Sequence, residues 1–249
     1  CKTLILTQPT YQGISYKMES IMSLALQHGL RVIVDEAHGS HFRFHEDLPS
    51  PALSLGAQIV IQSWHKTLPV MTQASVLHTG QNYTGPDILQ YLSLLHTTSP
   101  SYLLLASLDG CRDFLATEVS PLIVDKIEKV KKLLKKLSSL KNINIFEAPL
   151  QGIKADPFKL CLNSPKASGY QLAEFLRERF GIYVELAEER YCLIILGIVD
   201  DQRFLDRLTQ ALITLDIDLE GSSPYPFSKI GMDSAGARTK MLIREAFFR

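Results

Sequence analysis

Cysteine is scarce in this sequence, and its four residues, Cys1, Cys111, Cys161 and Cys192, stand too far apart to form a C-x-x-C pair. This spacing argues against a structural zinc site and against a disulfide framework, because both need cysteines in characteristic clusters. Unpaired cysteines fit a reducing compartment. We therefore predict a cytoplasmic protein.

Long apolar runs are also missing. No stretch approaches the roughly 20 apolar residues that a membrane-spanning helix needs, and no signal peptide is recognisable. Charge of one sign does not dominate either, because 26 Lys and Arg balance 26 Asp and Glu. A broad nucleic-acid-binding surface needs an excess of positive charge. We therefore expect neither a membrane nor a nucleic acid as a partner.

The sequence does have the size and composition of an ordinary globular protein. Its 249 residues, 46% of them hydrophobic, suffice for one large domain or two modest ones. The first residue is Cys1 rather than Met, and the residues after it already have a strand pattern. We therefore expect the chain to be a segment of a longer protein.

The first half alternates strand and helix patterns. A short apolar run, Leu4–Thr7, precedes apolar residues at helical spacing from Met18 to Ala25, and Gly29 stands where a helix C-cap is expected. Leu30–Val34 is then a β-branched run, typical of a strand covered on both faces. Strand, helix and strand within about 35 residues predict a right-handed βαβ unit. The further elements expected here are a short helix at 51–56, strands at 59–61 and 74–78, and helices at 86–95 and 101–115.

The second half begins with an amphipathic helix. Ser120 and Pro121 have the pattern of an N-cap followed by proline at the first helical position. Apolar residues then recur on one stripe, and lysines at the other positions are expected to form a solvated basic face. The stripe consists of Ile123, Ile127, Val130, Leu134 and Leu137, and the basic face of Lys126, Lys129, Lys132 and Lys136.

A smaller α+β unit is predicted from about Asn144, because short strand patterns alternate there with helix patterns. The expected elements are strands at 158–162 and 191–196 and helices at 170–179 and 204–215. Residues 221–224 resemble a linker. The predicted domains are 1–118, part of an α/β large domain with a mainly parallel sheet, 119–219, a small α+β domain, and 220–249, a linker and the start of a C-terminal domain.

Two polar segments follow neighbouring strands. Asp35 comes directly after Leu30–Val34, and Ser63-Trp64-His65-Lys66-Thr67 follows the strand at 59–61. Because ligands of such sheets bind beyond the carboxyl ends of the strands, we expect the segments to meet at one rim. A lysine that forms an imine and an aspartate that pairs with a ring nitrogen are the two anchors of pyridoxal 5'-phosphate (PLP). The sequence therefore predicts a PLP site built on Lys66 and Asp35.

Other residues of these segments suit the same cofactor. Ser63 and His65 can bind its phosphate through hydroxyl and imidazole hydrogen bonds, and His65 can also transfer protons. Ala37 is small enough for a flat ring to lie close above it. These residues complete the predicted cofactor site.

Each assignment has a plain structural alternative. Lys66 can be a surface lysine, Asp35 can cap the turn after its strand, and His65 can be a packed histidine bonded to backbone. His38, His41 and His45 could also form a metal cluster with Glu36 and Asp47, but their spacing matches no common ligand set. We predict no metal site.

Several segments resemble the Orn/Lys/Arg decarboxylases, which are fold type I, aspartate-aminotransferase-like PLP enzymes. The segments are Asp35–Phe42, Gln62–Leu68, Met71–Ser75, Leu95–Tyr102, Tyr183–Ala187 and Arg244–Phe248. They span nearly the whole chain, and the lysine segment is highly specific. The family's phosphate-cradling Ser/Thr-Gly turn and its ring-stacking aromatic residue have no match in this sequence.

The resemblance assigns roles to individual residues. It implies that Lys66 carries PLP as a Schiff base and that Asp35 pairs with the pyridine nitrogen. Ser63 and His65 would then hold the phosphate, and His38 would lie near the ring and substrate. The resemblance also implies that Thr97, Thr98 or Ser99 reaches the phosphate bound by a partner subunit. The last role requires a homodimer or a higher homo-oligomer with the site at the subunit interface.

The activity implied by the resemblance is loss of the α-carboxylate of a basic amino acid as CO₂, with Lys66 or His65 returning a proton. Arginine, lysine and ornithine all remain possible substrates, and the product serves polyamine biosynthesis. Two alternatives stay open: another fold type I activity, such as aminotransfer or aldol cleavage, and a non-catalytic or truncated relative that acts as a dimerisation or regulatory module.

Overall fold

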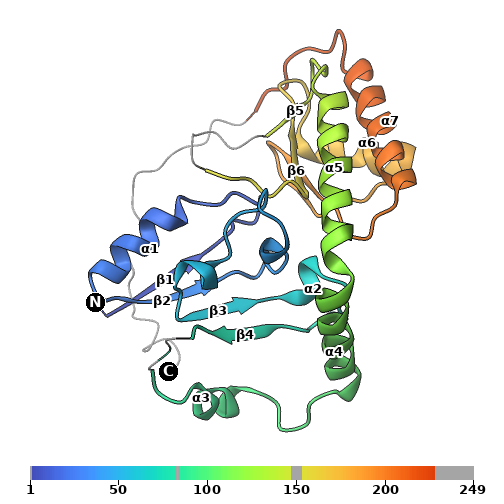
Figure 1. Ribbon diagram of the computed structural model, residues 1–249. Helices are drawn as coiled ribbons and strands as arrows, with labels where there is room; N and C mark the ends of the chain where they lie inside the picture. The colour runs from blue at the N-terminus through green and yellow to red at the C-terminus, as the bar shows by residue number, and fades with distance from the viewer. Residues whose placement is uncertain (1, 82, 84, 147–152, 228–249) are drawn as a thin grey trace, which may run out of the picture.

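The computed structural model describes residues 2–81, 83, 85–146 and 153–227 (Figure 1). The predicted start of a C-terminal domain beyond residue 227, with its motif Arg244–Phe248, lies outside the described residues. Among the residues described, no helix combines the length and the apolar character needed to cross a bilayer.

The N-terminal part is built on a mainly parallel four-stranded sheet, as predicted. Its strands lie in the order β1-β2-β3-β4, and only β4 is antiparallel to its neighbour. They are β1 (Thr3–Thr7), β2 (Arg31–Asp35), β3 (Ile59–Gln62) and β4 (Val76–Thr79). Helix α1 (Met18–Gln27) packs its buried side chains against Val32, Val34 and Val60 of the sheet. Gly29 follows α1 with a φ of 64°, which glycine adopts without steric cost.

Short helices and the connection to the second unit complete the N-terminal part. The 3₁₀ helices η1 (Phe42–Phe44) and η2 (Ala52–Leu55) precede β3, and the one-turn helix α2 (Trp64–Thr67) follows it. Helix α3 (Ile88–Leu95) lies at one end of the molecule (Figure 1). Helices α4 (Tyr102–Thr117) and α5 (Val119–Leu137) then run nearly end to end along one side, from α3 to the second unit (Figure 1).

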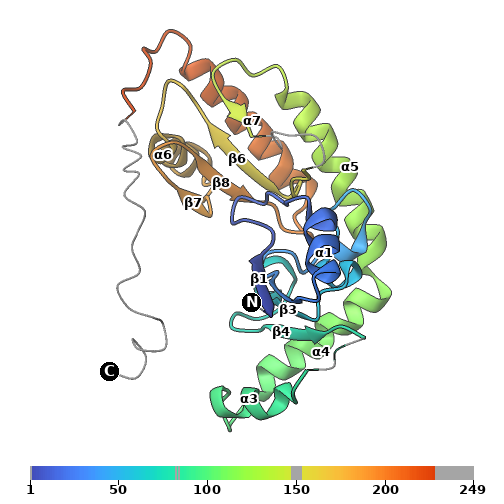
Figure 2. The ribbon, with the colours of Figure 1, turned by 90° about the vertical axis from the view of Figure 1, so that its left-hand side faces the viewer.

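The second unit is the α+β arrangement that the sequence predicts. Its antiparallel sheet has the order β5-β6-β8-β7 and is packed with α5, α6 and α7 (Figure 2). The elements are β5 (Asn144–Ile145), β6 (Lys159–Asn163), α6 (Gly169–Phe180), β7 (Leu186–Ala187), β8 (Cys192–Ile195) and α7 (Gln202–Asp218). Ser168 begins α6 with a capping box, because its hydroxyl and the Gln171 side chain satisfy each other's backbone N–H groups.

One hydrophobic cluster links the two units. It runs from Phe42 and Leu68 through α5 to the buried face of α7. The packing therefore continues across the boundary that we predicted between residues 118 and 119, and the division into domains stays a prediction.

The start of α5 differs from the prediction. The helix begins at Val119 with Glu118 as its N-cap, so Ser120 and Pro121 lie within its first turn. Pro121 is tolerated there because the N–H groups of the first turn have no acceptor within the helix. Val119 is only 1% exposed, and its burial favours the earlier start.

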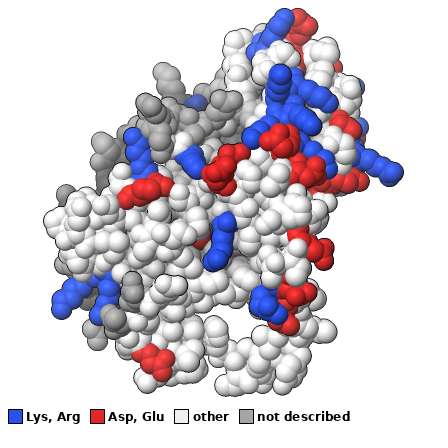
Figure 3. All heavy atoms as spheres, in the orientation of Figure 1, with Lys and Arg blue, Asp and Glu red and all other residues white. Residues whose placement is uncertain are grey.

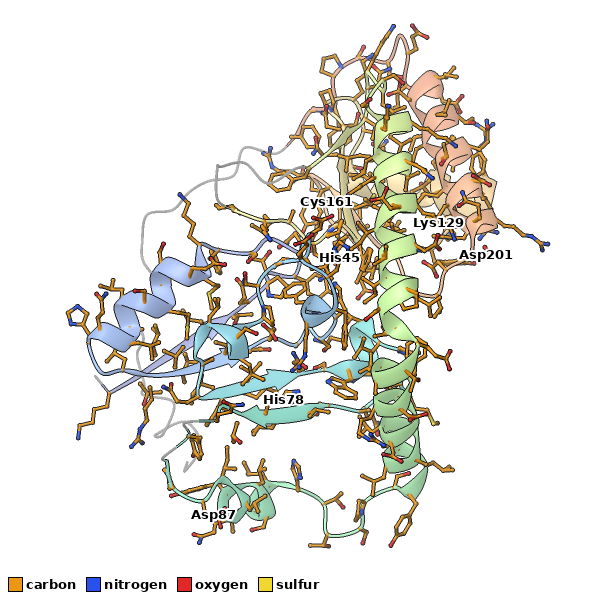
Figure 4. All side chains as sticks on the ribbon, in the orientation of Figure 1. His45, His78, Asp87, Lys129, Cys161 and Asp201 are labelled. Atoms are coloured by element: carbon orange, nitrogen blue, oxygen red, sulfur yellow. The ribbon has the colours of Figure 1, made fainter. Side chains whose placement is uncertain are left out.

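The predicted basic face of α5 is also wrong at one position. Lys126 is 2% exposed, and its Nζ donates to the carbonyl oxygen of Asp200 at 3.3 Å and lies 3.7 Å from the Asp200 carboxylate. Burial lowers the pKa of Lys126, which Asp200 partly offsets. Lys132 and Lys136 are exposed as expected, and the half-buried Lys129 pairs with Asp125 at 2.6 Å (Figure 4). The pattern of one helix does not reveal which face a second element covers.

Candidate active site

The two predicted anchor segments leave the sheet at the same edge. Strands β2 and β3 are parallel neighbours with Asp35 opposite Ile61. The turn after β2 and helix α2 after β3 therefore begin side by side. Their side chains meet, because Lys66 Nζ lies 3.3 Å from His38 Nε2. The structure thus brings Lys66 to the segment that Asp35 begins.

Asp35 ends β2 with an exposed carboxylate. Its Oδ1 accepts a hydrogen bond from the backbone N–H of Ala37 at 3.0 Å. This contact is the turn-capping alternative weighed for Asp35. It occupies one lone pair of a group that can accept about four hydrogen bonds. The side chain is therefore still able to pair with a cationic ring nitrogen.

His38 is held neutral by its surroundings. It is 8% exposed, and its ring centre lies 4.8 Å from that of Tyr11 in an edge-to-face arrangement. Burial, followed by the positive charges of Lys159 and Lys66, lowers the pKa of His38 to about 4. Because Nε2 accepts a hydrogen bond from Lys66 Nζ, the hydrogen of the neutral imidazole resides on Nδ1. That Nδ1 is buried and has no hydrogen-bond partner within the described part of the chain.

Ser63 and His65 flank the lysine on α2. The Ser63 hydroxyl makes no capping hydrogen bond to the helix. His65 Nδ1 lies 2.7 Å from the carbonyl oxygen of Ala74, so Nδ1 carries the hydrogen. The packed-histidine alternative thus holds for one ring nitrogen. The other nitrogen, Nε2, can donate to a phosphate when the ring is protonated.

The segment Thr97 to Ser99 is not brought to this rim. It lies in the exposed connection between α3 and α4, away from α2 in both ribbon views (Figures 1 and 2). The Ser99 N–H donates to Thr97 Oγ1 at 3.1 Å, which is a local turn. The expected role of Thr97, Thr98 or Ser99 belongs to another subunit's site and stays a prediction.

Sequence reasoning missed a buried polar network beneath the rim. Glu36 is 1% exposed and accepts from the Ala52 N–H at 2.8 Å and from Gln62 Nε2 at 2.7 Å. Gln62 Oε1 in turn accepts from Trp64 Nε1, and His78 Nε2 of β4 lies 3.1 Å from it (Figure 4). Burial raises the pKa of Glu36 to about 7, although both hydrogen bonds oppose this rise. The network ties the turn after β2 to the start of α2.

Sequence reasoning also missed the contribution of the second unit. Tyr11 Oη donates to Glu185 Oε1 at 2.6 Å, and Gln12 Nε2 donates to Tyr191 Oη at 2.8 Å. Lys159 Nζ donates to the Tyr11 carbonyl oxygen at 2.7 Å. The only sequence signal was the family-like segment around Glu185. These contacts join the loop after β1 to the second unit next to His38.

A cavity of about 160 Å³ opens between the two units at Lys66. Its polar lining includes Lys66, Lys159 and the buried pair of His41 and Asp156, whose Nε2 and Oδ2 lie 3.1 Å apart. Its other walls are mostly apolar and come from α2, Phe158 and the end of β8. Lys66 therefore lines a cavity with room for a small molecule.

The histidines of the loop after β2 serve separate partners. His41 faces Asp156, His45 Nδ1 lies 3.9 Å from Asp47 Oδ2, and Glu36 is bonded within the network described above. Among the described residues, no group of three or more His, Cys, Asp or Glu could hold a metal ion.

The residues at the rim fit PLP. An exposed carboxylate, an amine, an uncapped hydroxyl and a buried imidazole N–H without a partner stand at the ends of two neighbouring strands. Asp35, Lys66, Ser63 and His65 are the residues that would hold the cofactor. The orphaned Nδ1–H of His38 would gain an acceptor from a bound ligand.

Comparisons with solved structures agree with the architecture. The constitutive lysine decarboxylase of E. coli superposes with a TM-score of 0.68 at 20% identity, covering 87% of this chain and 37% of that one. A phosphoserine aminotransferase from Cytophaga hutchinsonii superposes with a TM-score of 0.60 at 14% identity, covering 86% of this chain and 63% of that one. The chain has the fold of the fold type I PLP-dependent enzymes.

Sequence comparison identifies the family. The model of the Orn/Lys/Arg decarboxylase major domain matches residues 1–154. The arginine decarboxylase of Bacillus subtilis is 38% identical over 218 residues, which are 85% of this chain and 44% of that protein. Protein YaaO of the same organism is 36% identical over 227 residues, which are 90% of this chain and 46% of that protein. The chain belongs to the Orn/Lys/Arg decarboxylase family and spans less than half the length of these relatives.

Proposed function

We propose that the protein containing this chain is a PLP-dependent decarboxylase of a basic amino acid, with PLP attached to Lys66. The observation that carries the proposal is the contact of Lys66 Nζ with the neutral His38, on the same rim as Asp35. Family membership supports the reaction class, because relatives with 38% identity are named arginine decarboxylases.

When bound, PLP supplies an electron sink for the electron pair left at Cα as CO₂ departs. Asp35 pairs with the ring nitrogen and keeps it protonated, which maintains the sink. Ser63 Oγ and His65 Nε2 bind the phosphate, while Ala37 leaves space for the ring. These residues would hold the cofactor at the rim beside Lys66 and so orient a substrate bound to it.

Proton handling falls to Lys66, with His65 as the alternative donor. Lys66 Nζ returns a proton to Cα after CO₂ has left. His38 Nε2 accepts from Lys66 Nζ and so orients the amine, and its low pKa keeps it an acceptor at neutral pH. His38 thereby positions Lys66 without competing for its proton.

The substrate is arginine, lysine or ornithine, and the product is the amine without the α-carboxylate. The names of the relatives favour arginine and lysine. We place the reaction in the cytoplasm and in polyamine biosynthesis, which consumes such amines.

A homodimer or higher homo-oligomer is part of the proposal. Helix α3 has no buried residue, and it exposes apolar side chains together with the start of α4. They are Leu89, Tyr91, Leu94, Leu95, Tyr102, Leu103 and Leu105. Figure 3 shows few charged groups on this lower part of the visible face, in contrast to the crowded charges over α5 and α7. A second copy that covers this apolar surface would bring its own site close to Thr97, Thr98 and Ser99.

The test uses the full-length protein. PLP is titrated in, and borohydride reduction followed by peptide mapping is expected to place the cofactor on Lys66. K66A is expected to abolish the adduct and amine formation, whereas K141A, at an exposed lysine remote from the rim, is expected to retain both. An adduct on another lysine, or no amine from arginine, lysine or ornithine, refutes the proposal. A keto acid or an aldehyde as product would instead indicate aminotransfer or aldol cleavage, and absence of PLP binding would indicate a non-catalytic module.

A further inference from the structure

Lys159 is an unusual residue in the cavity beside Lys66. It begins β6, is 5% exposed, and lies with Lys66 in the lining of one cavity although it comes from the other unit. Its ammonium donates to the carbonyl oxygen of Tyr11 at 2.7 Å. An ammonium has three donors, so this bond leaves donor capacity toward the cavity.

Within the described part of the chain Lys159 makes no ion pair, although the nearby carboxylates of Asp156 and Glu185 raise its pKa and so oppose the effect of burial. Among the described residues its polar contacts are the Tyr11 carbonyl and the face of the Tyr11 ring, 5.3 Å from Nζ. A buried cation without an ion pair is costly, and burial accordingly lowers the pKa of Lys159 to about 8. A ligand with a negative charge would remove this cost.

The neighbouring acid does not fill this role. Asp156 Oδ1 accepts the Phe158 N–H at 3.0 Å, and its Oδ2 faces His41 Nε2 at 3.1 Å. Among the described residues neither oxygen makes an ion pair with Lys159, although the carboxylate partly offsets the lowering of the pKa of Lys159 by burial. Lys66, the second cation of the cavity, contacts neutral His38. The lining of the cavity therefore contains two lysines, the carboxylate of Asp156 and mostly apolar walls, and its volume of about 160 Å³ resembles that of cavities that take up a molecule of benzene's size, about 150 Å³.

We propose that Lys159 binds the α-carboxylate of the amino-acid substrate. The proposal rests on the proposed function and adds a residue of the second unit to the site. The carboxylate would enter beside Lys66 and accept hydrogen bonds from Lys159 Nζ, while the apolar walls exclude water and strengthen the ion pair. The remaining contact of Lys159 with Tyr11 keeps its ammonium in place.

The reaction has a consequence for this ion pair. Departure of CO₂ carries away the carboxylate, and its electron pair passes to the cofactor, so the negative charge at Lys159 is lost in the transition state. The pair therefore stabilises the bound substrate more than the transition state, and its loss raises KM without lowering kcat. The amine product has no carboxylate, so Lys159 holds the substrate but not the product.

The test compares two ligands that differ in the carboxylate. In the full-length holoenzyme, KM is measured for the basic amino acid that is turned over, and Ki for its own amine product as a competitive inhibitor. K159Q keeps a donor for the Tyr11 carbonyl but loses the charge, and K159M loses both. Both variants are expected to raise KM by about 10- to 100-fold, the effect of one charged hydrogen bond, with Ki of the amine and kcat not lowered.

The control is K154M. Lys154 donates to the carbonyl oxygens of Glu46 and Leu48 across the same junction but does not line the cavity. This variant is expected to leave KM and Ki unchanged. If Lys159 only fastens the loop at Tyr11, K159Q will resemble wild type, or KM and Ki will rise together; either result overturns the proposal. A wild-type enzyme without turnover would refute the proposed function instead.

A measurement on the wild-type enzyme needs no variant. The carboxamide of the substrate lacks the negative charge but keeps the size of the carboxyl group. It is expected to inhibit with a Ki at least about 10-fold above the KM of the amino acid. Equal values would overturn the assignment of Lys159 even where the variants fail to fold.

Discussion

The acidity of His38 gives the sharpest quantitative prediction. Its pKa is lowered from 6.5 to about 4 by burial and by the nearby ammonium groups of Lys159 and Lys66. Between these two pH values the imidazole of His38 is protonated in the unfolded chain but not in the folded protein. The free energy of unfolding therefore falls as the pH falls through this window. At about 1.4 kcal/mol per pKa unit, the loss from this residue amounts to about 3 kcal/mol over the window.

The assay has two parts and uses the full-length protein without cofactor. NMR titration of the histidine ring signals, assigned with H38Q, is expected to give a midpoint near the lowered pKa of about 4. The free energy of unfolding is measured with urea at neutral pH and near pH 4.5. Between these two pH values it is expected to fall by about 2–3 kcal/mol more in wild type than in H38Q. His78, whose pKa is also lowered by burial, is present in both proteins and cancels. A midpoint of 6 to 7, or parallel pH dependence of the two proteins, refutes the reasoning.

Three further predictions concern the cofactor, the contact between Lys126 and Asp200, and the subunit contact. D35N is expected to weaken PLP binding about 10-fold or more in an absorbance titration, because a neutral amide pairs less well with a protonated ring; unchanged affinity would contradict the role of Asp35. K126M is expected to be neutral or to stabilise the fold by about 1–4 kcal/mol in urea unfolding, whereas D200A, which leaves Lys126 buried without its partner, is expected to cost about 3 kcal/mol; the reverse order would be inconsistent with the burial of this pair. L94D is expected to shift the oligomer toward monomer in analytical ultracentrifugation, since it places a charge on the apolar surface of α3; an undisturbed oligomer would exclude that surface.

The meeting of the two anchor segments at one rim can be predicted from the sequence, because it depends only on two neighbouring strands and the residues that follow them. Asp35 and Lys66 each follow a strand, and neighbouring parallel strands end at one edge, so their segments had to meet once the strands were recognised. The strands and helices of both units can also be predicted from the sequence, because hydrophobic periodicity indicates the buried face of a single element.

The rest depends on contacts between distant segments. Tyr11 contacts Glu185, which is 174 positions away in the sequence, and Lys159, which is 148 positions away. No pattern within either segment predicts these partners. Lys126 followed the spacing of a solvated face, yet the loop at Asp200 covers it. In the sequence Glu36 stands out only as a possible member of a metal cluster, and the position of Gln62 shows that it stabilises the scaffold instead.

The contacts that join the loop after β1 to the second unit have a mechanical consequence. Tyr11 is held at its hydroxyl by Glu185, at its carbonyl by Lys159, and at its ring by an edge-to-face contact with His38. A hinge motion that separates the two units must break the contacts with Glu185 and Lys159 together, whereas the contact with His38 lies within the first unit. Separation of the units would therefore release the tyrosine that packs against His38, the residue in contact with Lys66.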